Sequence, residues 1–330
     1  MPGISPTGSR MRILFITATR VGDAVLSTGL LAHLIDRYPK ARFTIAAGPL
    51  AAPLFEAVPR LERLIVVDKR RFGRHWLALL GKVIGTRWHL VVDLRGSALA
   101  YLVWTRRRIV GRKGDLRVHR VRELGQLVRL DPPPAPHLWT AARHESVAEA
   151  LVPPGPPILA LAPAANWRAK TWRAERFAEL AQRLTAPEGP LPGARVAVLA
   201  AAHERDQLSP VLAAIPASRR IDLVGEVDLL TAAAILRRAA LFIGNDTGLM
   251  HIAAAMGTPT LGLFGPSPVE RFAPWGARTA VAHTPLAPGE LMGAPEFDYR
   301  TTDTLMDGLT VDAVEAAARS LMRRVTGAVA

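Results

Sequence analysis

Residues 242–267 hold the side chains best suited to binding an anion. Their polar residues gather at Gly244-Asn245-Asp246-Thr247-Gly248, after an apolar run at 239–243 that predicts a buried strand. An alanine-rich run at 249–256 then predicts a helix, which carries His251 one turn in. A helix that begins at such a turn presents unpaired N–H groups and partial positive charge to a diphosphate. An ordinary capped turn is the alternative, but the clustering of polar residues favours a ligand site.

Three other turns carry residues that could take part in chemistry. Gly22-Asp23 stands between a predicted strand at 12–17 and a predicted helix at 24–38, where Asp23 can be a helix cap or a general base. The loop at 163–172 contains Lys170, which is either a solvated loop lysine or a cation for phosphate. Glu204 follows a predicted strand at 195–200.

These motifs resemble glycosyltransferase family 9, the heptosyltransferase family of lipopolysaccharide core synthesis. The family's donor segment reads approximately GNDTGxxHxAAAxGxPxxxLFGP, and this sequence reads GNDTGLMHIAAAMGTPTLGLFGP. Its GAxWxxKxWP element is similar to PAANWRAKTWR at 163–173, where Arg173 replaces the proline. Its N-terminal Gly-Asp motif matches Gly22-Asp23, although a proline often found shortly afterwards is replaced here by Ser27-Thr28-Gly29.

The resemblance implies an inverting transfer of heptose from ADP-L-glycero-D-manno-heptose to the lipopolysaccharide inner core, a Kdo or heptose acceptor. It implies that Asp23 is the general base and that Lys170 stabilises the departing nucleotide. The implied donor-binding residues are Asn166, Lys170, Glu204, Asp246, Thr247, Gly248 and His251. No metal site and no cofactor are expected, because His and Asp residues do not cluster at ligand spacing.

Strands that alternate with helices predict parallel, doubly wound sheets. The resemblance implies the GT-B architecture, in which two Rossmann-like domains face each other across a cleft. We expect a disordered lead-in at 1–10, an acceptor-binding domain at 11–152 and a nucleotide-sugar-binding domain at 153–309. A proline-rich linker is predicted at 153–157, and the helix within 310–330 is a candidate to pack back on the N-terminal domain.

The charge of the chain points to an anionic partner. The net charge is +14, and residues 60–129 alone hold 18 Lys and Arg against five acidic residues. Such a segment suits a phosphorylated acceptor, an acidic membrane surface or nucleic acid. Nucleic acid is disfavoured because no interleaved aromatic platform or recognised motif accompanies the charge. The resemblance places acceptor contacts at Arg60, Arg63, Lys69, Arg70, Arg71, Arg74 and Arg95.

Cellular location is predicted from what the sequence lacks. The chain has no cysteine, and no apolar run reaches the roughly 20 residues of a spanning helix. We therefore expect a soluble cytoplasmic protein. The resemblance implies that it works at the cytoplasmic face of the inner membrane and binds it peripherally, and we expect it to be a monomer. A GT-B transferase or an epimerase that uses another nucleotide sugar is the nearest alternative.

Overall fold

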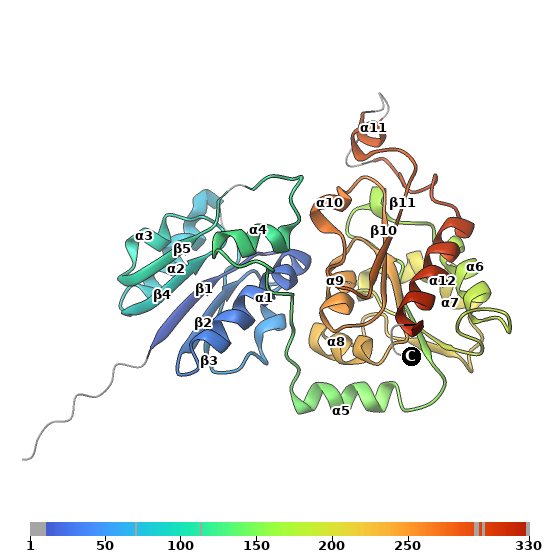
Figure 1. Cartoon of the computed structure of the whole chain (residues 1–330), viewed down its shortest axis with the longest axis horizontal. Helices are drawn as coiled ribbons and strands as arrows, with labels where there is room; N and C mark the ends of the chain where they lie inside the picture. The colour runs from blue at the N-terminus through green and yellow to red at the C-terminus, as the bar shows by residue number, and fades with distance from the viewer. Residues whose placement is uncertain (1–10, 70, 113, 294–296, 299–300, 328–330) are drawn as a thin grey trace, which may run out of the picture.

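The computed structural model describes residues 11–69, 71–112, 114–293, 297–298 and 301–327. The chain forms two α/β domains, each built on a parallel sheet with helices packed on it (Figure 1). The predicted lead-in at 1–10 lies outside the described residues. The predicted pair of parallel α/β domains is confirmed.

The first domain contains a five-stranded sheet in the order β3-β2-β1-β4-β5. All four strand pairings are parallel. Its strands are β1 (Arg12–Ile16), β2 (Arg42–Ala47), β3 (Leu61–Val66), β4 (Trp88–Asp93) and β5 (Thr105–Val110); its helices are α1 (Val21–Arg37), α2 (Arg74–Val83), α3 (Leu99–Leu102) and α4 (Arg120–Leu127). Helix α3 is short, because Val103 is extended and β5 begins at Thr105.

The second domain contains a six-stranded sheet in the order β11-β10-β9-β6-β7-β8. Its strands are β6 (Ile158–Ala162), β7 (Arg195–Val198), β8 (Arg220–Asp222), β9 (Leu241–Asn245), β10 (Thr260–Phe264) and β11 (Thr279–His283). The helices that accompany it are α5 (Ala142–Leu151), α6 (Ala174–Thr185), α7 (Ser209–Ala214), α8 (Leu229–Arg237), α9 (Gly248–Ala255), α10 (Val269–Phe272), α11 (Pro288–Met292) and α12 (Val311–Gly327). Both faces of this sheet are buried, which explains the continuous apolar strands β6 and β9.

Each sheet has one point at which the strand order reverses direction. It lies between β1 and β4 in the first sheet and between β6 and β9 in the second. Ligands of open α/β sheets bind beyond the carboxyl ends of the strands at this point. Asp23 follows β1, Lys170 follows β6, and Asp246 follows β9, so the fold brings three predicted site residues to these two positions.

The two domains are in direct contact. Helix α1 packs against α9, and one hydrophobic cluster runs from Leu30 of α1 to Ile252 of α9. A second contact is polar, because the buried guanidinium of Arg271 in α10 donates to the carbonyl oxygens of Asp115 and Val118 at 3.1 and 2.8 Å. Arg271 also pairs with the carboxylate of Glu123 in α4. These contacts fix the seam between the domains.

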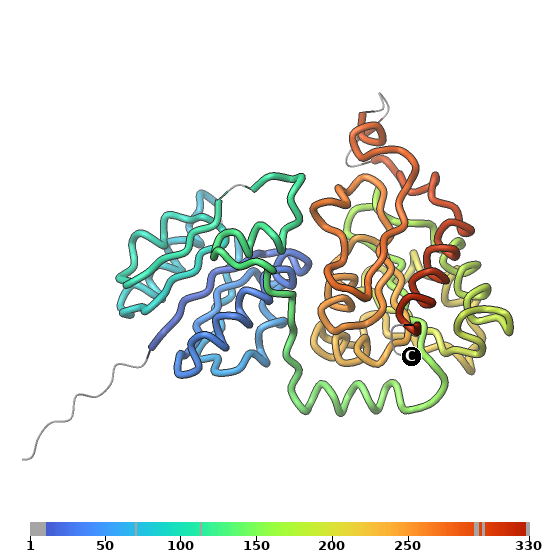
Figure 2. The backbone as a smooth tube through the Cα atoms, in the orientation of Figure 1, coloured from blue at the N-terminus to red at the C-terminus, as the bar shows by residue number. Residues whose placement is uncertain are grey.

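The chain crosses between the domains earlier than the predicted linker at 153–157. Helix α5 already packs against α8 of the second domain, with an ion pair between Arg237 and Glu145 at 2.6 Å. The crossing segment therefore precedes α5, and Figure 2 shows it running between α4 and α5. It docks on α1, where the hydroxyl of Thr28 accepts a 3.0 Å hydrogen bond from the backbone N–H of His137.

The C-terminal helix α12 packs differently from the suggestion made for residues 310–330. It contacts α6, β10 and β11, and its buried residues Val314 and Leu321 belong to the core of the second domain. Arg183 of α6 pairs with Asp312 of α12 at 2.6 Å. The apolar stripe of α12 therefore completes the second domain. Among the helices that the structure describes, none has the length and hydropathy of a membrane span.

Candidate active site

The turn between β9 and α9, together with the start of α9, holds an acidic group and two polar side-chain atoms that have no partner among the described residues. Thr247 is the extended N-cap residue of α9, and its hydroxyl oxygen is buried with no hydrogen-bond partner among the described residues. The Nδ1 atom of His251 is also buried and lacks a partner there. Buried polar atoms are normally paired, so unpaired ones beside a helix N-terminus indicate a site shaped for a ligand.

Lys170 is held against this turn by the loop that follows β6. Its ammonium group donates to a carboxylate oxygen of Asp246 at 3.0 Å and to the backbone carbonyl of Asp246 at 3.1 Å. Both side chains are largely buried. The predicted role of Lys170 beside a phosphate is therefore compatible with its position, and Asp246 keeps the ammonium group in place without substrate.

Asn245 is an important residue of the site that the sequence reasoning did not select. Its Oδ1 atom accepts a hydrogen bond from the backbone N–H of Trp172 at 3.1 Å, and its Nδ2 atom donates to the carbonyl of Pro163 at 2.6 Å. Asn245 thereby ties both ends of the loop carrying Lys170 to the end of β9. The signal was present in the motif, since Asn245 immediately precedes Asp246.

The N-termini of α1 and α9 meet across the domain seam. A methyl group added at Gly22 would lie 2.9 Å from Cδ2 of His251 and 4.0 Å from the Cα atom of Gly248. A methyl group added at Gly248 would lie 2.5 Å from a methyl of Val21. Two helix N-termini with partial positive charge therefore converge near Lys170. This arrangement suits a ligand with more than one negative charge.

Asp23 lies in the first turn of α1 and does not cap it. The N-cap residue is Arg20, and no hydrogen bond to the carboxylate of Asp23 is found among the described residues. Its negative charge acts on the His251 imidazole across the seam. An unpaired carboxylate at the topological switch point can accept a proton from a substrate hydroxyl.

His251 is neutral at physiological pH. Burial lowers the pKa of His251 to about 4, although the nearby carboxylates of Asp246 and Asp23 favour the charged form. Its Nε2 atom lies 3.9 Å from a carboxylate oxygen of Asp246, too far for a hydrogen bond. His251 therefore presents a neutral ring to the site.

The other predicted donor contacts lie beyond neighbouring strands of the second sheet. Asn166 is exposed in the loop after β6. Glu204 follows β7, and one of its carboxylate oxygens accepts the backbone N–H of Ala201 at 2.8 Å, which fixes the turn. The second oxygen remains available to a ligand. All of these residues stand at the carboxyl edge of the second sheet, on the same side as Asp246.

The structure divides the predicted basic residues into two groups. Arg60 immediately precedes β3 and Arg63 lies in the first half of that strand, and they donate to the carbonyls of Ile35 and Lys82 at 2.6 and 2.9 Å. Acceptor contact at these two residues stays a prediction, and their hydrogen bonds give them a role in the fold of the first domain.

The remaining basic residues follow the carboxyl ends of β3 and β4. Lys69, Arg71 and Arg74 occupy the turn into α2, and Arg95 follows β4. The guanidinium of Arg95 lies 4.7 Å from the ring centre of Trp76, and its partial burial lowers its pKa. Arg70 lies outside the described residues.

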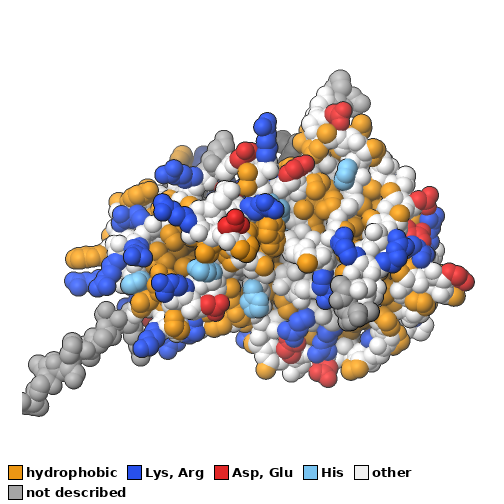
Figure 3. Space-filling model, viewed as in Figure 1, with side chains coloured by type: hydrophobic (Ala, Val, Ile, Leu, Met, Phe, Trp, Pro, Cys, Tyr) orange, Lys and Arg blue, Asp and Glu red, His pale blue; other side chains and the backbone are white. Residues whose placement is uncertain are grey.

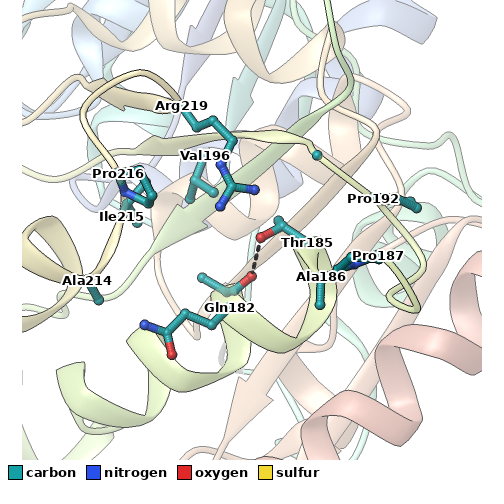
Figure 4. Close-up of a pocket in the computed structure, with 12 residues that line it drawn as sticks. Gln182, Thr185, Ala186, Pro187, Pro192, Val196, Ala214, Ile215, Pro216 and Arg219 are labelled. Carbon is teal, nitrogen blue, oxygen red and sulfur yellow. Dashed lines mark hydrogen bonds between the residues drawn. The ribbon is translucent and has the colours of Figure 1, made fainter.

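One cavity of the second domain lies away from this site. A cavity of about 680 Å³ lies between the end of α6 and the start of β7, lined by residues that include Gln182, Thr185 and Arg219 (Figure 4). Its lining contains one charged side chain and no carboxylate. It sits toward the amino end of β7 and holds no group able to perform the chemistry described above. Among the described residues, no three His, Cys, Asp or Glu side chains gather as a metal site.

The chain is similar in sequence and in fold to known proteins. The chain is 24% identical over 299 residues to lipopolysaccharide heptosyltransferase 2 of Salmonella typhimurium, covering 78% of this chain and 83% of the relative. Its fold matches a family 9 glycosyltransferase from Veillonella parvula with a TM-score of 0.75 at 20% identity, over 94% of this chain and 97% of that one. It matches the ADP-heptose lipopolysaccharide heptosyltransferase II of Escherichia coli with a TM-score of 0.72 at 21% identity, over 96% and 100% of the chains.

These likenesses confirm the predicted GT-B fold. The profile described as glycosyltransferase family 9 (heptosyltransferase) matches residues 78–290, which is more than half of the chain and includes Lys170, Asp246 and His251. The chain therefore belongs to glycosyltransferase family 9.

Proposed function

We propose that the protein is an inverting heptosyltransferase. It transfers a heptose from ADP-L-glycero-D-manno-heptose to the inner core of a lipopolysaccharide precursor. The meeting of the α1 and α9 N-termini beside Lys170 is the observation that carries the proposal, because a diphosphate complements this concentration of positive charge. The relatives are lipopolysaccharide and lipooligosaccharide heptosyltransferases, which supports heptose as the sugar.

In the proposed reaction, Asp23 accepts the proton of the acceptor hydroxyl while its oxygen attacks the anomeric carbon of the donor. The bond between that carbon and the β-phosphate oxygen breaks, and ADP leaves with the electron pair. Lys170 and the N–H groups of Thr247 and Gly248 stabilise the charge on the leaving phosphate. One displacement inverts the anomeric centre, so no covalent enzyme intermediate is needed.

Residues around the site are assigned to the rest of the donor and to the acceptor. Glu204 offers its free carboxylate oxygen to the ribose, and Asn166 donates to the phosphates. His251, as a neutral ring, contacts the sugar or phosphate without adding charge. Lys69, Arg71, Arg74 and Arg95 bind the phosphates and carboxylates of the acceptor, since guanidinium groups bind such anions bidentately.

The cellular setting belongs to the same proposal. The enzyme acts as a monomer at the cytoplasmic face of the inner membrane and binds that membrane peripherally. It is proposed to need no metal ion, because helix N-termini and Lys170 can supply the positive charge. Turnover unaffected by a chelator would support this, and its loss with recovery on adding a divalent metal would contradict it.

The function is tested by incubating the purified protein with ADP-heptose and defined lipopolysaccharide core acceptors, with and without a first heptose. We expect product only with acceptor present, with the anomeric configuration inverted as seen by NMR. UDP-glucose and UDP-N-acetylglucosamine serve as control donors. Turnover of one of these instead would assign a different sugar, and conversion of the donor without acceptor would indicate an epimerase.

A further inference from the structure

The outer surface of α2, α3 and the start of β5 exposes large apolar side chains. Leu77 is 69% exposed, Tyr101 64% and Trp104 67%, and Ile84 and Leu102 are also more than half exposed. The two helices contact each other and cover the same side of the first sheet. We call this surface, formed by Leu77, Ile84, Tyr101, Leu102 and Trp104 with Arg87, Arg106 and Arg108, the α2–α3 face.

The α2–α3 face is cationic and has no exposed carboxylate. Residues 71–110 contain eight Lys and Arg but a single acidic residue, Asp93. Asp93 is fully buried and its carboxylate accepts the backbone N–H groups of Arg95 and Ser97 at 2.9 and 2.8 Å. The charge of the face is therefore not neutralised by carboxylates of the same segment. Figure 3 shows basic and apolar side chains intermixed on the surface of the first domain.

The arginines of the face lie beside its aromatic rings. The guanidinium of Arg87 lies 4.7 Å from the ring centre of Trp104, and that of Arg108 lies 5.5 Å from the ring centre of Tyr101. Arg108 is paired in register with Val91, which belongs to the core beneath α2 and α3. Arg106 is two residues away, so it projects to the same side of the strand.

Protection of a sheet edge accounts for only part of this surface. Strand β5 is the edge of the first sheet, and charged residues on an edge strand prevent pairing with other chains. That role explains the arginines at 106–108. It does not explain why Trp104 and Tyr101 are exposed beside them, nor why α2 adds Leu77 and Ile84 on its outer surface.

We propose that the α2–α3 face docks on an anionic phospholipid bilayer. Tyr and Trp side chains partition to the interface between lipid and water, arginines pair with lipid phosphates, and carboxylates would be repelled there. Apolar side chains of an amphipathic helix such as α2 insert below the headgroups. The face combines all three properties.

The position of the face relates it to the active site. Arg95, which stands at the carboxyl end of β4, lies over Trp76 of α2, so the basic residues of the cleft edge continue into the α2–α3 face. Docking through this face holds the acceptor side of the cleft next to the bilayer. The inference rests on the proposed function for its biological purpose, since the proposed acceptor carries a lipid.

The test measures binding to sedimented vesicles of phosphatidylcholine with about three parts in ten of phosphatidylglycerol, at low and high salt. We expect wild-type protein to bind these vesicles, to bind pure phosphatidylcholine at least tenfold less well, and to be released by salt. Arg87→Glu/Arg106→Glu should reduce binding at least tenfold, and Tyr101→Ser/Trp104→Ser should do the same at low salt.

The matched control is Lys40→Glu/Arg42→Glu, which makes the same charge change at two exposed residues at the amino edge of the sheet. It should retain vesicle binding, and equal loss in this control would reduce the effect to overall charge and overturn the inference. Failure of the wild type to bind vesicles would overturn it too, as would stronger binding to single-stranded DNA that depends on the same arginines. Vesicle binding without heptose transfer would leave the docking face standing and reject only the proposed function.

Discussion

Gly22 of the first domain lies directly against His251 of the second. The ring of His251 occupies the space that a side chain at Gly22 would need, since an added methyl group would approach its Cδ2 atom to 2.9 Å. Both residues lie near the start of a helix, and both helices begin at the proposed donor site. The seam between the domains is therefore also the wall of the site.

Gly22→Ala should disturb this wall. Alanine is a better helix former than glycine by roughly 0.5–1 kcal/mol, so in open space the change would stabilise the protein. At Gly22 we expect the clash with His251 to cancel this gain and to lower kcat/KM at least tenfold. Gly81→Ala in α2 is the matched control, because beyond its chain neighbours and the backbone of its own helix the added methyl group would have no atom within 4 Å. A gain of stability and full activity in both variants would show that the ring of His251 can move aside and that its contact with Gly22 is not needed for activity.

Substitutions in the ion pair between Lys170 and Asp246 can distinguish an effect on stability from an effect on catalysis. Lys170→Met leaves the buried carboxylate of Asp246 without its partner, which costs up to about 3–5 kcal/mol. The double variant Lys170→Met/Asp246→Asn removes the unpaired charge and should regain most of the stability measured by urea unfolding. Activity should stay low in both variants. Recovery of turnover in the double variant would mean that Lys170 serves only to neutralise Asp246.

The burial of His251 makes the unfolding free energy depend on pH. The folded state lowers the pKa of His251 to about 4 from an ordinary value of 6.5, so between these values the unfolded state binds more protons. The free energy of unfolding is therefore unaffected by His251 ionisation above pH 6.5, and it falls as the pH is lowered from 6.5 toward 4. We expect His251→Asn to reduce the loss of stability between pH 7 and pH 5. An unchanged slope in the variant would assign the pH dependence to other groups.

Features that depend on neighbouring residues could be predicted from the sequence, whereas contacts between residues far apart in the chain could not. The strand before Asp246, the helix after it and the loop with Lys170 have local signals, namely apolar runs, glycine and proline. The polar contact between Arg271 and the carbonyls of Asp115 and Val118 has none, because the partners are more than 150 residues apart. The early domain crossing was missed for a related reason, as α5 is fixed to the second domain by its contact with α8.

The basic residues show a second limit. Arg63 and Arg71 are close in the sequence, yet Arg63 lies in the first half of β3 and Arg71 lies beyond its carboxyl end. Charge counting cannot assign a residue to a strand end unless the limits of the strand are known. The hydrogen bonds between Asn245 and the loop that carries Lys170 were likewise not predictable, although Asn245 immediately precedes Asp246 in the sequence.

This division of the arginines is itself testable. Arg71→Ala/Arg74→Ala removes two exposed cations at the cleft end of the first sheet, and we expect the KM for a delipidated, phosphorylated acceptor to rise about tenfold or more. The KM for the donor should remain unchanged. Arg63→Ala, in the first half of β3, is the control, and it should leave the KM for the acceptor and the KM for the donor unchanged. If the KM for the acceptor rose equally in the Arg71→Ala/Arg74→Ala variant and in the Arg63→Ala variant, the acceptor would bind elsewhere.

Asp23→Asn tests the proposed general base. Asparagine keeps the size of the side chain but cannot accept the proton, so kcat should fall by roughly 10²–10⁴-fold. The affinity for ADP should stay nearly the same. Stability should change by less than about 1 kcal/mol, because the carboxylate makes no hydrogen bond to described residues and loses only its interaction with the N-terminus of α1. Asp36→Asn, a change of the same kind at the exposed end of α1, is the control for charge and should leave kcat unaltered. Near-normal turnover of Asp23→Asn would remove Asp23 from the mechanism, while the membership of family 9 would stand.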